Sequence, residues 1–371
     1  MEKASSFISS SEISEIIRFV IRAGLFLLSL LCMIGLTNFF VDPSHVYGDG
    51  SYERGIAEIL ASGKNVANVV DFDQKLVQRI LIEKRRMPSD VVIIGSSRSM
   101  QIGSNIFPGA NVMNNSISGA TLDVYLSLLS CYDKKNLFPK KLILGFDPWV
   151  LMPDLGEEWP SLNGNELSIL EKLGATELNV RPPLVPKRWQ NIFSLAYFQV
   201  SAKDLFKRRL QANRYFSTDE ERADYTILLR DGRRSYDKAF RSKSVQEVEG
   251  EVRDSLLKAE RPAFQLGRMD PDWARVLEKA IVYLQGQGVD VVIFLPPQHP
   301  DVYKSFMGSV RNRVIVDTEA YFRELAQKRH LKIVGSYDPS RCGLTGADFY
   351  DAGHVTAEGV ERIFSSAAIG M

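Results

Sequence analysis

Residues 91–98 read VVIIGSSR, a short apolar run that stops at a glycine, two serines and an arginine. A run of β-branched residues bounded by turn residues is typical of a strand buried inside a parallel sheet. Later runs of the same kind also end in turn residues: 110–113, 141–144, 289–295 and 331–334. Helical patterns fall between these runs, at 122–132, 273–286 and 318–329. The alternation predicts an α/β fold built on a doubly wound parallel sheet.

The first strand of the predicted sheet leads into the turn Gly95-Ser96-Ser97-Arg98. Ligands of open α/β sheets bind beyond the carboxyl ends of the strands, where this turn would lie. A serine at a strand-to-helix turn exposes its hydroxyl there, and backbone N–H groups of the turn could stabilise an oxyanion. Serine is equally favoured at such a position as a simple helix N-cap, so the turn leaves both interpretations open.

A second polar turn, Asp351-Ala352-Gly353-His354, lies near the C-terminus before a final helical stretch. A serine nucleophile needs a base, and histidine is the usual one near neutral pH. The histidine in turn needs an acceptor that fixes its tautomer and orientation. Asp351, three residues before His354, can supply that acceptor. A loop histidine without a catalytic role is the alternative.

These two turns and the stretch 114–121, NNSISGAT, resemble blocks I, II and V of the SGNH, or GDSL-like, hydrolases. They occur in the order of that family and at the ends of the corresponding predicted strands. The resemblance covers residues 91–363 without the stretch 153–271, and it implies a three-layer, flavodoxin-like fold.

The same resemblance assigns roles to individual residues. It implies that Ser97 is the nucleophile, His354 the base and Asp351 the partner of that base. In the second block it implies that the backbone N–H of Gly119 binds an oxyanion together with the N–H of Ser97. Asn115, in the same block, is a further candidate for oxyanion or substrate binding.

One position departs from the family pattern. The third block of the family ends in an asparagine that donates to the oxyanion, but this sequence reads GFDPW at 145–149, with Asp147 in that place. An ionised carboxylate cannot donate and would repel an oxyanion. Asp147 is therefore protonated, points elsewhere, or is replaced by other donors. Loss of one such donor costs on the order of 3 kcal/mol, which slows catalysis without necessarily abolishing it.

Two other residues near the predicted strand ends have alternative interpretations. Arg98 could neutralise a carboxylate or phosphate of a substrate, or it could pair with Asp147 and hold the site together. His299, within PPQHP at 296–300, could bind substrate or act as a second base. The alternative for His299 is a loop histidine fixed between two prolines.

The N-terminal part of the chain contains an uncharged apolar run at 23–41, with Arg18 and Arg22 before it and Asp42 after it. The run is about long enough to cross a hydrocarbon core of roughly 30 Å. A cleaved signal peptide or a buried core helix are alternatives, but the run is long for a signal peptide and ends in a poor cleavage site. The positive-inside rule predicts a single-pass anchor in the cell inner (cytoplasmic) membrane, with a cytoplasmic segment 1–22 and an extracytoplasmic, periplasmic C-terminal domain.

The remaining segments complete the predicted domain organisation. Residues 42–88 are expected to form juxtamembrane linker helices, and 89–152 with 272–371 the SGNH-like domain. Residues 153–271 lack a good parallel-strand signal and are rich in charge and helix formers, as at 202–214 and 244–260. We interpret 153–271 as an insertion that is a lid, a partner surface or a solvated helical excursion.

Bulk composition adds few constraints. The formal net charge of +1 gives no sign of a nucleic-acid partner. The three cysteines form no metal-binding pattern, so neither a metal nor another cofactor is expected. Cys131 and Cys342 are far apart in sequence, and whether they form a disulfide is left open.

An anchor followed by GSSRS, LGFDPW and a late DxxH resembles the extracytoplasmic acyl-transfer branch of the superfamily. That branch includes the alginate O-acetylation proteins and the D-alanylation protein of lipoteichoic acid synthesis. The resemblance implies an O-acyl transferase, for acetyl groups above all, or an esterase that acts on an envelope or exported polysaccharide through an acyl-serine. It also implies a membrane-bound acyltransferase as a partner. The alternative, favoured by Asp147, is a weak or inactive SGNH-fold component that scaffolds polysaccharide assembly or modification.

Overall fold

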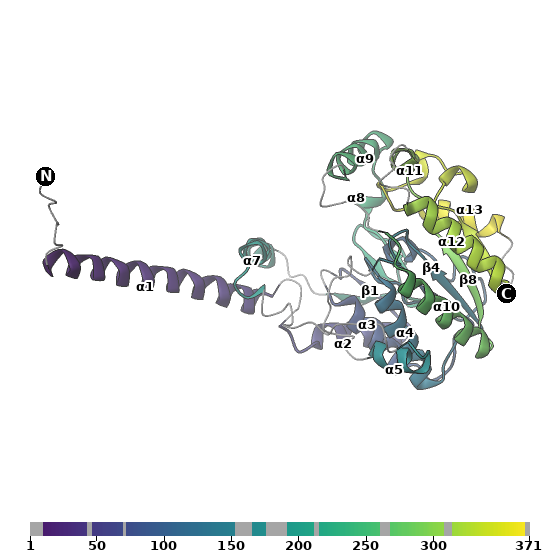
Figure 1. Cartoon of the computed structure of the whole chain (residues 1–371), viewed down its shortest axis with the longest axis horizontal. Coiled ribbons are helices and arrows are strands. Elements are labelled where there is room, and N and C mark those ends of the chain that lie inside the picture. Colours follow the sequence, from purple (N-terminus) through teal and green to yellow (C-terminus); the bar gives the residue numbers. More distant parts are fainter. Residues whose placement is uncertain are drawn as a thin grey trace, which may run out of the picture. The chain divides into compact units, whose positions relative to one another are not determined.

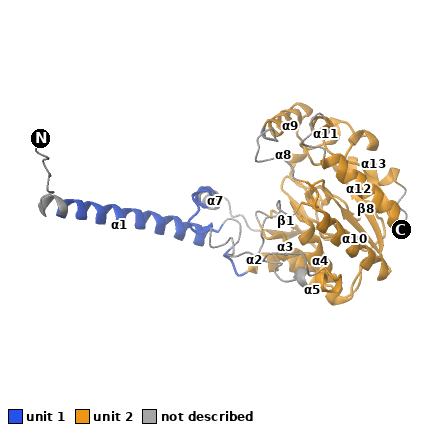
Figure 2. Cartoon of the chain, in the orientation of Figure 1, with its two compact units in different colours: residues 1–49, 183–213 blue, residues 50–182, 214–371 orange. Residues whose placement is uncertain are grey.

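The computed structural model describes residues 10–42, 47–69, 72–152, 165–175, 191–210, 215–259, 268–307 and 314–367. The contacts within the chain divide it into two units (Figure 2). Unit 1 comprises residues 1–49 and 183–213, and unit 2 comprises residues 50–182 and 214–371. The stretch 153–271, predicted as one insertion, is therefore divided between the two units.

The described part of unit 1 is dominated by two helices, α1 (Ser10–Val41) and α7 (Leu195–Leu210). The stretch Ser14–Val41 of α1 is long and apolar enough to cross a membrane. Only 11% of its most apolar window is buried, which is unlike the core helix of a globular domain. The helix is thus consistent with the single-pass anchor predicted at 23–41.

Unit 2 is built on a five-stranded, wholly parallel sheet with the order β3-β2-β4-β8-β9 (Figure 1). The central strands are in register, so that Val92 of β2 pairs with Met113 of β3 and with Leu142 of β4. The strands are β2 (Val91–Ile94), β3 (Val112–Asn114), β4 (Lys141–Gly145), β8 (Asp290–Leu295) and β9 (Lys332–Gly335). All five lie within two residues of the predicted runs, and the α/β class is confirmed.

Both faces of this sheet are covered, because successive strand residues point to opposite sides. Val92 and Ile94 belong to a core shared with helices α4, α10 and α12, whereas Val91 and Ile93 belong to a second core shared with α13. The bounds of these helices are α4 (Leu122–Lys135), α10 (Pro271–Gly286), α12 (Val314–Arg329) and α13 (Ala357–Ser366). The first three match the predicted helical patterns at 122–132, 273–286 and 318–329.

Side-chain caps determine where two of these helices begin. Asp270 accepts hydrogen bonds from the N–H groups of Asp272 and Trp273, and Pro271 occupies the first turn of α10. Thr356 accepts a hydrogen bond from the N–H of Gly359 and so starts α13. The cap at Thr356 fixes the end of the loop that carries His354.

A small antiparallel sheet in unit 2 was not predicted. Its order is β5-β1-β6-β7, and it joins strand β1 from the predicted linker to three strands from the predicted insertion. The strands are β1 (Asn65–Ala67), β5 (Phe216–Thr218), β6 (Ile227–Leu228) and β7 (Arg234–Ser235). Strands of two or three residues are too short to show an alternating pattern in sequence. The linker 42–88 and the insertion 153–271 are consequently not separate bodies.

The β6–β7 turn reaches the edge of the main sheet. The N–H of Asn114, on edge strand β3, donates to the carbonyl of Asp231 over 2.7 Å. Gly232 has a φ of +82°, and a Cβ there would overlap the carbonyl oxygen of Asn114. Only glycine permits both this conformation and this close approach. The turn thereby covers a sheet edge that would otherwise be free.

The other helices surround these sheets. Helices α2 and α3 precede β2, and α3 packs on α4 in Figure 1. The bounds are α2 (Ser51–Ala61), α3 (Gln74–Lys84), α5 (Asn165–Lys172), α8 (Lys238–Arg241), α9 (Val245–Ala259) and α11 (Pro300–Met307). The predicted helical stretches at 202–214 and 244–260 correspond to the end of α7 and to α9.

The cysteines are not bonded to one another in this structure. Cys131, Cys342 and Cys32 are all free thiols. Cys131 belongs to the core on one face of the main sheet and Cys342 packs against the core on the other. Because the sheet separates them, the disulfide left open by the sequence does not form.

Candidate active site

Ser97 begins a short 3-10 turn, Ser97–Ser99, directly after β2 and Gly95. The hydroxyl of Ser96 caps this turn by accepting a hydrogen bond from the N–H of Arg98 at 3.2 Å. The capping role therefore belongs to Ser96, which leaves the hydroxyl of Ser97 available for other contacts. This resolves the alternative that Ser97 is only an N-cap.

Two glycines allow the turn to sit close to the sheet. Gly95 follows β2 and Gly145 ends the neighbouring strand β4, and the side chain of Ser99 packs against both. A Cβ at either glycine would overlap Ser99 Oγ. Any larger residue at these positions would push the Ser97 turn away from the strand ends.

The structure brings Ser97, His354 and Asp351 together. His354 Nε2 lies 2.9 Å from Ser97 Oγ. Nδ1 of the same ring lies 3.0 and 2.9 Å from the two carboxylate oxygens of Asp351. If Nδ1 carries the proton, His354 donates to Asp351 and its Nε2 accepts the hydrogen of the Ser97 hydroxyl. This is the arrangement of a nucleophile, a base and an orienting acid.

Asp351 is held in its ionised form. Burial by itself would raise the pKa of Asp351, but hydrogen bonds from the His354 ring and from backbone N–H groups outweigh burial and lower the pKa to about 2. Asp351 Oδ1 accepts from the N–H groups of Gly353 and His354, each at 2.8 Å. The carboxylate of Asp351 is thus charged near neutral pH. Its bonds to the backbone fix its position independently of its contact with the imidazole.

The loop that carries both residues is closed on itself. Phe349 and Val355 form an antiparallel bridge across it, and the N–H of Tyr350 donates to the carbonyl of His354 at 2.8 Å. Since Thr356 caps the following helix, the loop is constrained at both ends. These contacts explain how a histidine 257 residues away in sequence is held against Ser97.

Arg98 and Asp147 form a buried ion pair beside the triad. Arg98 Nη1 lies 2.9 Å from Asp147 Oδ1, and the two side chains are only 4% and 1% exposed. Of the alternatives for Asp147, the structure therefore shows a carboxylate that points to Arg98. Of the alternatives for Arg98, it shows the pairing with Asp147. A guanidinium and a carboxylate so deeply buried can coexist because each neutralises the other.

Arg98 also joins several loops of the site. Its Nε donates to the carbonyl of Gly353 at 2.9 Å, and its Nη2 donates to the carbonyls of Pro296, at 2.7 Å, and Pro297. The guanidinium thereby links the turns after β2, β4 and β8 to the residue next to His354. With its nitrogens engaged in these contacts, Arg98 has a positioning role and is not arranged to contact a substrate anion.

Gly119 lies in an exposed turn after β3, with φ +64° and open space around its Cα. The turn is tied to the Ser97 turn, because the N–H of Ile117 donates to the carbonyl of Gly95 at 2.9 Å. The N–H of Ser97 has no acceptor among the described residues. These observations are compatible with the predicted oxyanion donors, which remain a prediction.

One candidate from the sequence does not face Ser97. The amide of the fully buried Asn115 donates to Gln78 Oε1 at 2.6 Å and accepts from the Tyr132 hydroxyl at 2.5 Å. Asn115 is therefore a core residue that joins α3 to α4, and the prediction that it binds substrate is corrected. The sequence did not reveal these contacts, because they depend on how α3 and α4 pack around Asn115 and not on the pattern within either helix.

His299 lies beside the loop that carries Asp351 and His354, and its backbone N–H donates to the carbonyl of Ala352 at 3.4 Å. Its Nδ1 accepts from the N–H of Asp301 at 3.3 Å, and its ring packs 5.3 Å from that of Phe349. Burial lowers the pKa of His299, so its neutral form is favoured. The interpretation as a structural loop histidine fits these contacts, and the suggested role in substrate binding or as a second base stays a prediction.

The stretch 153–271 contributes an aromatic wall that sequence reasoning missed. The Tyr236 hydroxyl donates to the carbonyl of Ser97 at 3.3 Å, and the rings of Tyr236 and Phe240 lie 6.2 and 6.1 Å from that of His354. Tyr350 packs 5.4 Å from Phe240 on the same side. Burial raises the pKa of Tyr236 to about 12, so its hydroxyl stays protonated. Nothing in the sequence around these aromatic residues indicated that they would lie beside Ser97.

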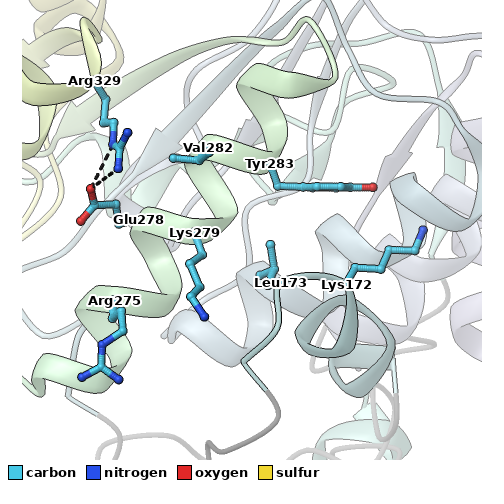
Figure 3. A pocket seen from close by; sticks show the side chains of 8 residues that line it. All are labelled: Lys172, Leu173, Arg275, Glu278, Lys279, Val282, Tyr283 and Arg329. Atoms are coloured by element: carbon cyan, nitrogen blue, oxygen red, sulfur yellow. Dashed lines mark hydrogen bonds and ion pairs between the residues drawn. The ribbon is translucent and has the colours of Figure 1, made fainter.

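A separate groove of about 550 Å³ lies between α5 and α10, lined by basic side chains (Figure 3). Arg329 bonds to Glu278, and Lys279 donates to the carbonyl of Gly174. Lys172 pairs with Asp133. Arg275 pairs with Asp272. The four cations of the groove are thus already engaged within the protein, and none of the triad residues lines it. Among the described residues, no cluster of His, Cys, Asp and Glu is arranged to hold a metal ion.

No protein-family model and no curated protein sequence matches this chain. The likeness to SGNH hydrolases therefore depends on the motifs and on the geometry described above.

Proposed function

We propose that this chain is a membrane-anchored serine acyl transferase or esterase of the SGNH type. The observation that supports the proposal is the continuous contact from Asp351 through His354 to Ser97 Oγ, at 2.9 to 3.0 Å per step. The position of these residues beyond the strand ends of a parallel α/β sheet agrees with the family resemblance.

The proposed chemistry begins with attack of Ser97 Oγ on the carbonyl carbon of an acyl ester, while His354 Nε2 takes the hydroxyl proton. The oxyanion that forms would be stabilised by the N–H groups of Ser97 and Gly119. Collapse of the intermediate breaks the ester C–O bond, and the leaving alkoxide receives the proton from His354. Ser97 then carries the acyl group.

The second half of the reaction repeats these steps with an acceptor. A sugar hydroxyl, or water, attacks the acyl-serine while His354 takes its proton, and Ser97 leaves with that proton restored. Transfer and hydrolysis differ only in the acceptor. An acetyl group on an envelope or exported polysaccharide is the substrate that the family resemblance implies, and a membrane-bound acyltransferase is the implied donor partner.

The length and apolar character of α1 support an anchored protein. With Arg18 and Arg22 before the apolar stretch, the positive-inside rule favours a cytoplasmic N-terminus and an extracytoplasmic unit 2 in the inner membrane. An acyl transferase so placed would meet exported polymers directly at the membrane surface.

A second candidate function is a catalytically weak or inactive scaffold in polysaccharide modification. Asp147 favours it, because the carboxylate stands where the family has an oxyanion donor. The intact contacts among Ser97, His354 and Asp351 favour the enzyme.

Turnover of an aryl acetate by the detergent-solubilised full chain distinguishes the two functions. We expect acetate release that falls by about 10³-fold or more in Ser97→Ala and His354→Ala. Addition of a short acetyl-accepting oligosaccharide separates transfer from hydrolysis by the product formed. Equal rates for all three proteins would support the scaffold instead.

A further inference from the structure

Helix α7 is attached to the C-terminal end of the membrane-spanning helix α1 through a buried asparagine. Asn38 is fully buried, and its Nδ2 lies 3.0, 3.0 and 3.1 Å from the carbonyls of Asn191, Ile192 and Ser194. Its Oδ1 accepts from the hydroxyl of Ser201 at 3.0 Å. A polar side chain within an apolar span is costly unless it is satisfied, and here α7 and the residues just before it satisfy it.

The same face of α1 makes two further contacts. Gly35 lies beneath the Phe193 ring, since a Cβ at Gly35 would be 3.1 Å from Phe193 Cε1. Asp42 Oδ1 accepts from the Tyr197 hydroxyl at 2.8 Å. Gly35, Asn38 and Asp42 are spaced by three and four residues, so they share one face of the helix. The start of α7 is therefore level with the last turns of the apolar span.

Helix α7 exposes large apolar side chains as well as polar ones. Leu195 is 60% exposed, Val200 is 47% exposed and Leu205 is 41% exposed. Gln199 and Lys203 are exposed too. Tyr197 and Ser201, four residues apart, are directed to Asp42 and to Asn38 of α1 instead. Within the part of unit 1 that the structure describes, the three apolar side chains are therefore not buried against α1.

Aromatic rings gather at the same level. The rings of Phe39 and Tyr47 lie 5.6 Å apart, and those of Tyr47 and Tyr197 lie 6.4 Å apart. Tyrosines at the end of an apolar span are typical of the boundary between hydrocarbon and headgroups.

We propose that α7 is a second membrane-contacting helix that lies in the interface of the bilayer, held there by Asn38 of α1. Its exposed apolar side chains contact lipid acyl chains, and phospholipids are its partner. This proposal goes beyond the acyl-transfer function and does not depend on it. The chain would consequently leave the membrane after α1 and meet the membrane surface again at α7.

Lipid photo-crosslinking of the full chain tests the proposal. A benzophenone amino acid is placed at Leu195, at Val200 or at Val245, which is 45% exposed on α9 of unit 2 and so matches Val200 in type and exposure. Each protein is reconstituted into vesicles of phosphatidylcholine and phosphatidylglycerol with a radiolabelled lipid. We expect irradiation at Leu195 and Val200 to label the protein at least five-fold more than at Val245.

Two results would overturn the proposal. Labelling at both α7 positions that is no higher than at Val245 would show that the helix does not touch lipid. Crosslinking of α7 to a second copy of the chain in place of lipid would assign these apolar side chains to self-association.

The variant Asn38→Leu tests the role of the asparagine separately. We expect several-fold less lipid labelling from Val200 while the protein still resists alkaline extraction, because α1 remains a span. Unchanged labelling from Val200 would show that Asn38 does not hold α7 at the membrane.

Discussion

At the scale of single residues, the site depends on Asp351 as much as on the nucleophile. The carboxylate is fixed by two backbone N–H groups and contacts His354 through both oxygens. An acid held in this way selects the imidazole tautomer whose Nε2 can accept the proton of Ser97. Loss of the Asp351 carboxylate is therefore predicted to lower the rate of catalysis.

Asp351→Asn should leave substrate binding intact and lower kcat by about 10³- to 10⁴-fold, because an amide favours the wrong tautomer of His354. The aryl acetate assay measures this, with the circular dichroism spectrum as a check on folding. A loss of less than ten-fold would be incompatible with the proposed orienting role.

Asp351 should also contribute to stability in a pH-dependent way. Its pKa is lowered from 3.8 to about 2 in the folded protein, so its contribution is complete above about pH 4 and is lost as the pH falls through about 2. The contribution is about 2 kcal/mol. Urea unfolding between pH 2 and pH 5 should show a steeper fall in the free energy of unfolding for the natural chain than for Asp351→Asn. Parallel curves would contradict this.

The buried pair Arg98–Asp147 makes a different prediction, about stability. Asp147→Ala leaves a buried guanidinium without its counter-charge and should lower the free energy of unfolding by about 3–5 kcal/mol. The matched control is Asp219→Ala, which removes the exposed partner of Lys64 and should cost less than about 1 kcal/mol. The free energy of unfolding of both variants is measured by chemical denaturation. Similar losses in the two would show that the buried pair stabilises the protein no more than an exposed pair does.

At the scale of elements, the β6–β7 turn is the connection between the small sheet and the main one. It covers the β3 edge through Asp231 and Gly232, and Tyr236, just after β7, reaches Ser97. A segment outside the SGNH-like pattern thus helps to build the site.

Gly232→Ala should therefore destabilise the protein more than Gly288→Ala. Both glycines have positive φ, +82° and +78°, but only at Gly232 would a Cβ overlap backbone, that of Asn114. We expect a difference of about 1–3 kcal/mol in the free energy of unfolding. Equal losses of unfolding free energy in the two variants would mean that the positive φ alone determines the loss. The turn could then move away from β3 to make room for the Cβ.

The sequence predicted the regular part of the fold because buried parallel strands are short, continuous apolar runs, as at Val91–Ile94. It also predicted that Ser97 and His354 would meet, from the residue types in their two turns and from the resemblance of those turns to the SGNH motifs. It did not predict β1 or β6, whose two or three residues have no detectable period. Nor did it show that Asn115 would face Tyr132 rather than Ser97, since a side chain's direction depends on packing between elements far apart in sequence.

At the scale of the whole molecule, the chain combines an apolar helix with a globular unit that carries the triad. We propose that the helix confines this chemistry to the surface of the cell inner membrane, with unit 2 on the extracytoplasmic side. Membranes from cells that express the full chain should retain it after alkaline extraction, and protease added outside intact spheroplasts should digest unit 2. Protection of unit 2 from the protease would reverse the proposed topology.

The central claim is that Ser97 is an activated nucleophile, and labelling by a fluorophosphonate measures that most directly. The full chain in detergent should gain one phosphonyl group, located on Ser97 by peptide mass spectrometry, and His354→Ala should react at least about 10²-fold more slowly. The same rate in the natural chain and in His354→Ala, or a label that persists in Ser97→Ala, would contradict the claim.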